Sequence, residues 1–379
     1  MKDVMDQTIY QLESPHGLDA LISTLASQGY EVIGPTIRDR TIVLASIKST
    51  KDLPFGMGDS QEKGSYRLVK KQGDQGYFGY NLGPTSWKSY LFPERRRLWQ
   101  LKRNGNPEAT HAELKPFAFL GVRACELAAI HVQDRTFLRD DGDPDFRRRR
   151  ENTFIIGVHC RTAAATCFCP SMGTGPEFTA TGWDLLLTED QNRFFIEAGT
   201  DKGKSVLSAL PVTAAPKDAK TIIETQLAHT KGLITREMDQ TNIKEQIYNS
   251  VATHNWDDVG SRCLACANCT LVCPTCFCST VEDVSDVEGI TAERWQKWDS
   301  CFHIDFSYVH GGSRRITTAS RYRQWFTHKL ATWYDQFGSS GCVGCGRCVA
   351  WCPVGIDITE EMASIRKDAE PKKEAQKDE

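Results

Sequence analysis

The hydrophobic positions near the start of the chain predict one helix followed by two strands. Apolar side chains recur every three or four positions over residues 18–25, and Gly29 follows where a left-handed cap would end that helix. Residues 30–33 and 41–47 predict short strands. Residues 50–110 show no clean period, which favours surface strands and loops over an aromatic cofactor site. We therefore expect an N-terminal α+β region over residues 1–115.

Two continuous apolar runs follow, at residues 117–122 and 153–158. Runs of this kind are typical of strands that are buried on both faces of a sheet. A helical pattern over 127–132 lies between them, and residues 184–197 predict a hairpin. Together these elements predict an α/β domain over residues 116–215, which contains four cysteines.

Helical patterns dominate the rest of the chain. Residues 217–258 are mostly helical in pattern, and an aromatic stripe over 322–337 keeps helical spacing until Gly338 can end it. We interpret the stripe as a core face. The tail over 366–379 is highly charged with almost no apolar residues, which predicts disorder. The expected fold class is α+β, with an N-terminal α/β region followed by a mainly helical domain over 216–365.

Composition narrows the functional class. A chain of 379 residues is long enough for two or three domains, and 40% hydrophobic with 25% charged residues is ordinary for a soluble globular protein. The net charge of -3 argues against a nucleic-acid binder, which would show a basic domain. No signal peptide and no stretch of about 20 apolar residues is evident, so we expect no membrane span and a cytoplasmic location.

Fifteen cysteines are the strongest chemical signal. In the reducing cytosol they are better interpreted as metal ligands than as a disulfide framework. Eight of them form two copies of the spacing C-x2-C-x2-C-x3-C-P: Cys263, Cys266, Cys269 and Cys273 before Pro274, and Cys342, Cys345, Cys348 and Cys352 before Pro353. This is the bacterial ferredoxin run, in which three cysteines hold one cluster and the fourth reaches the other cluster of the pair.

Zinc is the alternative to an iron–sulfur cluster, because soft thiolates select both. Structural zinc sites usually take paired C-x2-C units, whereas here a triple with an offset fourth cysteine occurs twice. We therefore predict a two-cluster ferredoxin domain with two 4Fe-4S clusters. The first cluster is assigned to Cys263, Cys266, Cys269 and Cys352, and the second to Cys342, Cys345, Cys348 and Cys273.

Four further cysteines lie in the α/β domain, and they make a candidate third 4Fe-4S cluster. Cys125 and Cys160 follow the two apolar runs, at the strand ends where open α/β sheets place ligands, and Cys167 and Cys169 share a loop. A helix N-terminus beside Cys125 would favour its thiolate. The irregular spacing leaves buried structural thiols as the alternative. Cys276, Cys278 and Cys301 cannot be assigned from spacing.

Several stretches together resemble the beta (iron–sulfur) subunit of cytosolic sulfhydrogenases, which are heterotetrameric nickel–iron hydrogenases. The chain is similar, more distantly, to the A subunit of anaerobic sulfite reductase. The resemblance covers roughly residues 15–365, and the stretch over 160–176 is specific to this group. The motifs that carry it lie at residues 121–126 (GVRACE), 159–160 (HC), 166–176 (TCFCPSMGTGP), 273–278 (CPTCFC), 298–301 (WDSC), 321–325 (RYRQW) and 342–353.

The resemblance implies an electron-transfer subunit that performs no catalysis itself. It would sit between a flavin subunit that handles NAD(P)H, of the diaphorase type, and a catalytic partner. That partner would be a nickel–iron hydrogenase small and large pair, or the reductase subunit of another complex. The resemblance also strengthens the expectation that four cysteines of the α/β domain bind metal: Cys125, Cys160, Cys167 and Cys169. The alternatives are the A subunit of a complex like anaerobic sulfite reductase, a stand-alone flavin-binding iron–sulfur oxidoreductase, and an iron–sulfur scaffold protein.

Overall fold

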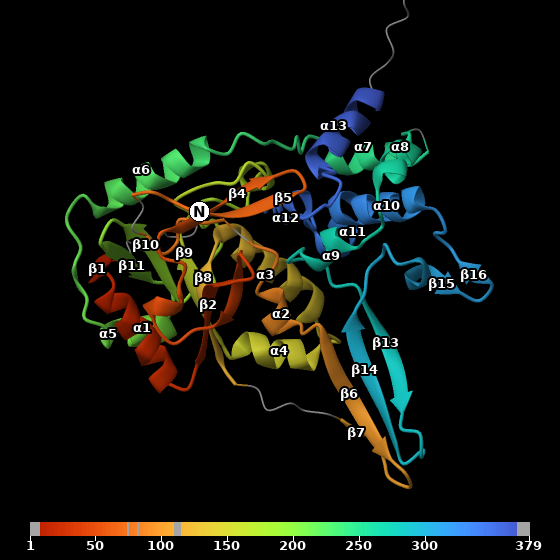
Figure 1. Ribbon diagram of the computed structural model, residues 1–379, viewed down its shortest axis with the longest axis horizontal. Coiled ribbons are helices and arrows are strands. Elements are labelled where there is room, and N and C mark those ends of the chain that lie inside the picture. Colours follow the sequence, from red (N-terminus) through yellow and green to blue (C-terminus); the bar gives the residue numbers. More distant parts are fainter. Residues whose placement is uncertain (1–7, 74–75, 82, 110–114, 253, 370–379) are drawn as a thin grey trace, which may run out of the picture.

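The structure is a computed structural model that describes residues 8–73, 76–81, 83–109, 115–252 and 254–369 (Figure 1). Its largest element is an eight-stranded sheet with strand order β12-β1-β11-β10-β9-β8-β2-β3. The strands are β1 (Tyr10–Glu13), β2 (Glu31–Arg38), β3 (Thr41–Ser46), β8 (Phe117–Val122), β9 (Thr153–Val158), β10 (Leu185–Asp190), β11 (Arg193–Ala198) and β12 (Thr213–Ala214).

The middle of this sheet is parallel, and its edges are antiparallel. Strand β8 pairs in parallel with β2 and β9, and β9 pairs in parallel with β10. The hairpins β2–β3 and β10–β11 extend the sheet on either side. The two apolar runs are thus the central strands β8 and β9, where both faces are covered, which confirms the prediction from their continuous hydrophobicity. The sheet takes strands from both sides of residue 115.

Helices cover both faces of the sheet. One core joins the apolar side of α1 (His16–Ser27) and α5 (Asp201–Ser208) to alternate positions of the strands, such as Leu120 and Ile156. The opposite positions, Phe119 and Ile155, pack in a second core with α3 (Ala124–Phe137) and α4 (Pro144–Glu151). Alternate residues of a strand point to opposite faces, so each central strand supplies both cores. The helices predicted over 18–25 and 127–132 lie in α1 and α3.

A second sheet forms an arm that extends away from the body (Figure 1). Its strands run in the order β13-β14-β6-β7: β6 (Arg95–Lys102), β7 (Glu108–Ala109), β13 (Ser279–Ser285) and β14 (Thr291–Trp298). All of its neighbours are antiparallel. Because β6 pairs with β14, the arm ties the region before the large sheet's central strands to the region between the two cysteine runs.

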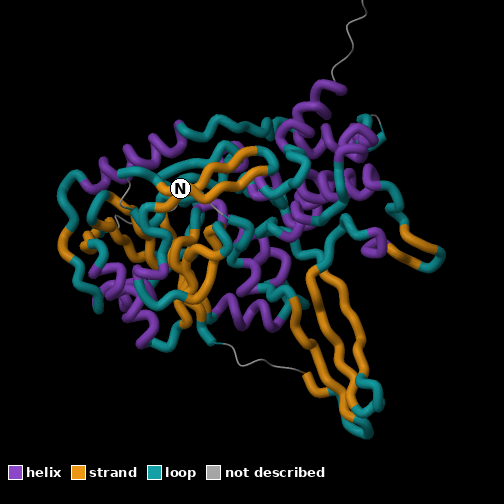
Figure 2. Tube along the Cα trace, viewed as in Figure 1, coloured by secondary structure: helices purple, strands orange, loops and turns teal. Residues whose placement is uncertain are grey.

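The remaining helices, which flank or contain the cysteine runs, gather on the side of the molecule opposite α1 (Figure 1 and Figure 2). They are α7 (Ile243–Ser250), α8 (Trp256–Arg262), α9 (Asn268–Leu271), α10 (Thr318–Thr327), α11 (Trp333–Phe337), α12 (Arg347–Ala350) and α13 (Ile358–Ala369), with a π-helical segment over His328–Thr332. The long α6 (Ala219–Gly232) leads to them, and α2 (Lys88–Leu91) packs near α4. The α+β fold class predicted from the sequence is confirmed.

Shorter elements complete the chain. They are the hairpin β4 (Met57–Glu62) and β5 (Ser65–Lys70), the hairpin β15 (Tyr308–Val309) and β16 (Gly312–Ser313), and short 3-10 turns over Thr50–Asp52, Cys169–Met172 and Ile304–Ser307. The aromatic stripe over 322–337 is helical and buried at Tyr322, Trp325 and Trp333, and Gly338 ends it with φ of +70°. Helix α13 includes residues 366–369, which the charge pattern placed in the tail; residues 370–379 lie outside the described part of the chain.

Candidate metal centres

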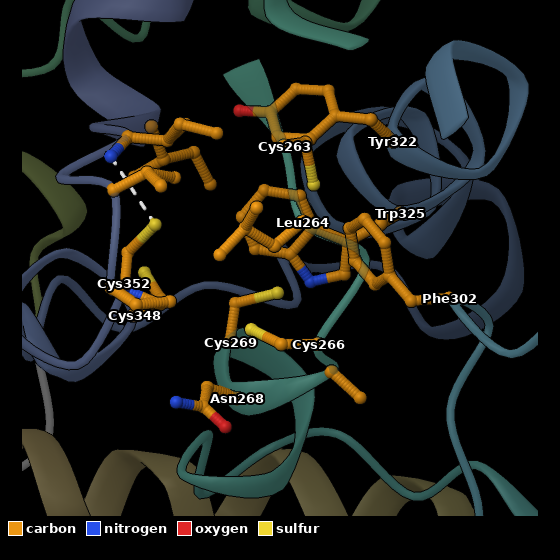
Figure 3. Close-up of a pocket in the computed structure, with 15 residues that line it drawn as sticks. Cys263, Leu264, Cys266, Asn268, Cys269, Phe302, Tyr322, Trp325, Cys348 and Cys352 are labelled. Carbon is orange, nitrogen blue, oxygen red and sulfur yellow. Dashed lines mark hydrogen bonds between the residues drawn. The ribbon is translucent and has the colours of Figure 1, made fainter. Parts of the chain in front are cut away.

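The first cysteine run and the end of the second line one apolar cavity, here named cavity A (Figure 3). Five thiols line it, together with three aromatic rings: Cys263, Cys266, Cys269, Cys348 and Cys352, and Phe302, Tyr322 and Trp325. The four cysteines that the spacing assigns to the first cluster are thus brought together from two distant segments. Cys348, which the spacing assigns to the second cluster, also lines this cavity.

Local backbone geometry turns the first run around cavity A. Helix α8 ends at Arg262, and Ala265 and Ala267 then adopt left-handed conformations with φ of +50° and +68°. The amide of Ala265 donates to Cys263 Sγ at 3.4 Å. On the other side, the amide of Ile356 donates to Cys352 Sγ at 3.3 Å, the dashed line that ends at Cys352 in Figure 3. Such N–H···S contacts stabilise a thiolate ligand.

Two polar atoms in the aromatic wall indicate what cavity A can accept. Trp325 Nε1 and Tyr322 Oη are buried and have no hydrogen-bond partner among the described protein atoms. Burial raises the pKa of Tyr322 well above its usual value, so its hydroxyl remains a donor. Buried donors of this kind normally have a partner. Sulfide and thiolate sulfurs are acceptors, so the donor set, the thiols and the apolar wall fit an iron–sulfur cluster.

The second run forms a loop with the same geometry. Gly344 and Gly346 are left-handed, with φ of +65° and +74°, at the positions that correspond to Ala265 and Ala267 in the first run. The amide of Gly344 approaches Cys342 Sγ at 3.5 Å, which repeats the contact made by Ala265. The repeated sequence spacing therefore folds into a repeated loop conformation.

The thiols of this loop form group B with Cys273. Burial and the nearby Cys273 sulfur raise the pKa of Cys342, to about 12, and of Cys345 and Cys348. The ammonium of Lys329 lies 3.3 Å from Cys273 Sγ, and it is buried with the thiols. The geometry thus brings together the four cysteines that the spacing assigns to the second cluster, and adds a cation that the sequence analysis did not single out.

The four cysteines of the α/β domain line another apolar cavity, named cavity C, with Cys345 as a fifth thiol. Cys125 stands at the start of α3 and Cys160 follows β9, while Cys167 and Cys169 lie on the loop that begins the 3-10 turn. The loop is held against group B, because the amide of Phe168 donates to the carbonyl of Gly344 at 2.9 Å. The irregularly spaced thiols therefore converge in space.

Electrostatics in cavity C differ in one respect from the sequence-based expectation. Helix α3 does begin beside Cys125, yet burial raises the pKa of this thiol well above its usual value. Loss of hydration thus outweighs the helix N-terminus in the protein alone. The guanidinium of Arg123 also lines the cavity, and it donates to the carbonyls of His159 at 2.8 Å and Phe78 at 2.9 Å. A buried cation beside four thiols fits an anionic metal–thiolate centre.

The three unassigned cysteines also meet. The Cys278 and Cys301 thiols hydrogen-bond to each other, and Cys276 does so with Cys273. The hydrogen bond from Cys301 lowers the pKa of Cys278 to about 7. We name Cys276, Cys278 and Cys301 group D. Among the described residues, no three His, Cys, Asp or Glu side chains converge closely enough to hold a single metal ion.

The ferredoxin half and the sheet half are joined by a buried ion pair. Arg347, between two cysteines of the second run, donates to Glu126 of α3 at 2.6 Å, and both side chains are at most 2% exposed. Glu126 also accepts from Trp87 Nε1 at 2.9 Å. Arg347 Nε donates to the carbonyl of Gly83 at 2.9 Å. This pair could not be predicted from the sequence, because neither residue has a recognisable spacing to the other.

Comparisons with known proteins agree with the cysteine geometry. Residues 262–356 match the family model described as a 4Fe-4S dicluster domain. The chain is similar to "Sulfhydrogenase 2 subunit beta" of Pyrococcus furiosus, with 28% identity over 285 residues, which covers 74% of this chain and 82% of the relative. No solved structure matches the chain. In the described part of the chain, no helix is both long and apolar enough to cross a bilayer.

These matches confirm the resemblance that the cysteine runs and the 160–176 stretch predicted, and they favour iron–sulfur clusters over the zinc alternative. Residues 262–356 thus match a 4Fe-4S dicluster domain, and the chain as a whole is similar to a sulfhydrogenase beta subunit.

Proposed function

We propose that this chain is the electron-transfer subunit of an oxidoreductase complex. It relays electrons between a flavin subunit that oxidises or reduces NAD(P)H and the catalytic subunit of a nickel–iron hydrogenase or sulfur reductase. The homology to a sulfhydrogenase subunit and the dicluster domain support this proposal. The reduced thiols and the redox chemistry suit the cytoplasm.

Each of three thiol groups supplies the ligands of one cluster. Cys263, Cys266, Cys269 and Cys352 hold one 4Fe-4S cluster in cavity A, and Cys342, Cys345, Cys348 and Cys273 hold a second at group B. Cys125, Cys160, Cys167 and Cys169 hold a third in cavity C. Bound there, such clusters supply one-electron redox chemistry.

One observation carries the proposal: the thiol groups share walls. Cys348 belongs to group B by spacing and lines cavity A, while Cys345 belongs to group B and lines cavity C. Group B therefore adjoins both cavities and shares one cysteine side chain with each. A protein that only stored iron, or used it as a structural staple, would not need three adjoining thiol groups in series.

The surroundings suit redox centres of different potential. Cavity A is walled by aromatic rings, whereas group B has the ammonium of Lys329 and cavity C the guanidinium of Arg123. Positive charge and hydrogen bonds to sulfur stabilise the reduced state of a cluster and raise its potential. The three clusters are therefore expected to have different potentials.

Cavity A is also the end of the series nearest the surface. Cys266 is exposed, and two apolar side chains beside it, Leu264 and Val354, are 63% and 43% exposed. Exposed apolar side chains around a redox centre are typical of a protein interface. We place the docking face for a partner protein here.

The test uses the full chain, purified anaerobically, alone and in the complex from its own cells. In the intact complex, NADH or NADPH is expected to produce EPR signals of reduced clusters in this chain. The isolated chain is expected to be reduced by dithionite and not by NAD(P)H, because it lacks the flavin subunit. An isolated chain that binds flavin and reduces a dye with NAD(P)H would show a stand-alone enzyme and contradict the relay proposal.

A further inference from the structure

Group D is the set of thiols that neither the ferredoxin spacing nor the relay proposal uses. Cys276 and Cys278 follow the first run, and Cys301 follows the arm strand β14. Pairing of β13 with β14 places Ser279 opposite Trp298, so the chain segments just before and after that pair lie side by side. The amide of Asp299 then donates to the carbonyl of Cys278 at 2.9 Å. The arm thus brings Cys301 to Cys278, which lies two residues after Cys276 in the chain.

Two buried lysines flank these thiols. Lys329 Nζ lies 3.4 Å from Cys276 Sγ, and Lys88 Nζ donates to the carbonyl of Cys276 at 3.2 Å. The Lys88 ammonium also lies 3.7 Å from the centre of the Trp298 ring. Each lysine is 3% exposed, and within the described residues neither has a carboxylate at ion-pair distance. The chain has therefore buried two ammonium groups beside three thiols.

Buried charges require counter-charges, since removing an ammonium from water is costly. Carbonyl groups and an indole ring compensate Lys88 only in part. Thiolates bound to a metal are permanently deprotonated and would supply the missing negative charge. A disulfide between Cys278 and Cys301 is the competing chemistry, because these thiols touch. It would be neutral, and it would leave Lys88 without a counter-charge and Lys329 with only the group B thiolate of Cys273.

We propose that Cys276, Cys278 and Cys301 bind a further iron–sulfur cluster, whose negative charge is offset by Lys88 and Lys329. Soft thiolates select iron–sulfur clusters or zinc. Reduction adds negative charge to a cluster, and the two ammonium groups stabilise that charge. Zinc does not change its oxidation state, so a zinc site would gain no such stabilisation. Cys273 touches Cys276 but stays with group B, so an iron without a cysteine ligand would remain in this cluster. The site lies next to the relay, at the base of the arm.

The first test compares the full chain, purified anaerobically, with its Cys301→Ser variant. The proposal expects iron and acid-labile sulfide to fall by about four atoms each per chain, with the EPR signals of the other clusters retained. Cys266→Ser is the matched control, because it removes a ligand of cavity A and should abolish a different signal. Unchanged iron in a folded Cys301→Ser chain, loss of zinc in place of iron, or a Cys278–Cys301 disulfide in the native chain would each overturn the proposal.

The second test does not depend on a cysteine variant. Lys88→Met keeps the length of the side chain and removes its charge, so the cluster at group D should be retained and become harder to reduce. The EPR signal whose midpoint shifts in Lys88→Met should be the signal that Cys301→Ser abolishes. A shifted signal that persists in Cys301→Ser, or no shift of any signal, would contradict a cluster at group D.

Discussion

A buried ion pair between Arg347 and Glu126 joins the ferredoxin half of this protein to the sheet half. Arg347 stands between Cys345 and Cys348, and its guanidinium is buried against Glu126 of the sheet half. A buried pair of this kind contributes little when intact relative to apolar packing, but removal of one partner leaves the other charge uncompensated. The pair therefore fixes the position of the second cysteine loop more than it adds to stability.

Glu126→Ala is expected to lower the free energy of unfolding by about 3–5 kcal/mol, because Arg347 would remain buried without its carboxylate. The measurement is urea denaturation of the anaerobic protein. Glu360→Ala is the control: Glu360 pairs with Lys63, both are largely exposed, and its loss should cost at most about 1 kcal/mol. Equal destabilisation by the two variants would contradict the role given to the buried pair.

A second charged residue, Asp143, makes the free energy of unfolding depend on pH. Asp143 caps α4 by accepting from the amides of Asp145 and Phe146, and it pairs with Arg96 of the arm strand β6 at 2.9 Å. Burial alone would raise the pKa of Asp143, but the Arg96 hydrogen bond and charge lower it below its ordinary value. The stability it provides is therefore present above the unfolded-state pKa of about 4 and is lost as the pH falls through the lower folded-state value.

Asp143→Asn should keep the helix cap and lose the charge. At pH 7 we expect it to lower the free energy of unfolding by about 1–3 kcal/mol, the range for hydrogen bonds to charged groups. The difference from the parent chain should shrink as the pH falls below about 4, because Asp143 is protonated first in the unfolded parent chain and, at lower pH, in the folded one. Denaturant midpoints measured from pH 7 to pH 3 test this; a difference that stays constant over the range would contradict the ion pair.

Among the elements, the second cysteine loop is the most constrained by its neighbours. A Cβ atom on Gly344 would lie 2.6 Å from the amide nitrogen of Cys169, and one on Gly346 would lie 2.3 Å from the carbonyl oxygen of Thr166. The first run has alanine at the equivalent positions. Glycine in the second loop thus permits group B to approach the loop that carries Cys167 and Cys169.

Gly344→Ala is expected to reduce stability and to disturb clusters at both group B and cavity C. Gly338→Ala is the matched control, because Gly338 also has positive φ but nothing lies within 4 Å of an added Cβ. The control should cost about 1 kcal/mol from backbone strain alone. Iron content and thermal melting of the two variants distinguish them; equal effects would show that the close approach at Gly344 is unimportant.

Elements with one strong local pattern could be predicted from the sequence, and elements without one could not. Strands β8 and β9 were predicted because continuous apolar runs are buried on both faces. The arm was missed, since its strands are half exposed and carry charged side chains on both faces, so they have no apolar alternation. Cys301 could not be grouped with Cys278 for the same reason, because the arm is what brings them together.

For the whole molecule, the cysteine ligands too divide into those that a local sequence pattern predicts and those that depend on tertiary packing. The two ferredoxin runs have a spacing that implies reach within a short loop, so their eight cysteines could be assigned in advance. Cys125, Cys160, Cys167 and Cys169 were a candidate set by their place at strand ends, and the sheet does bring them to one cavity. Arg123, Lys88 and Lys329 could not be predicted, because a cation's partner is fixed by tertiary packing and leaves no spacing in the sequence.

Cavity A, group B and cavity C are proposed to hold iron–sulfur clusters in series. The most direct test of this proposal is the iron and acid-labile sulfide content of the anaerobically purified chain, with EPR of the dithionite-reduced protein. We expect about twelve irons with matching sulfide for the three clusters in series, of which about eight belong to the two ferredoxin clusters, about four more irons for group D, and interacting signals from adjoining clusters. Zinc without sulfide, or iron that gives no signal on reduction, would contradict it.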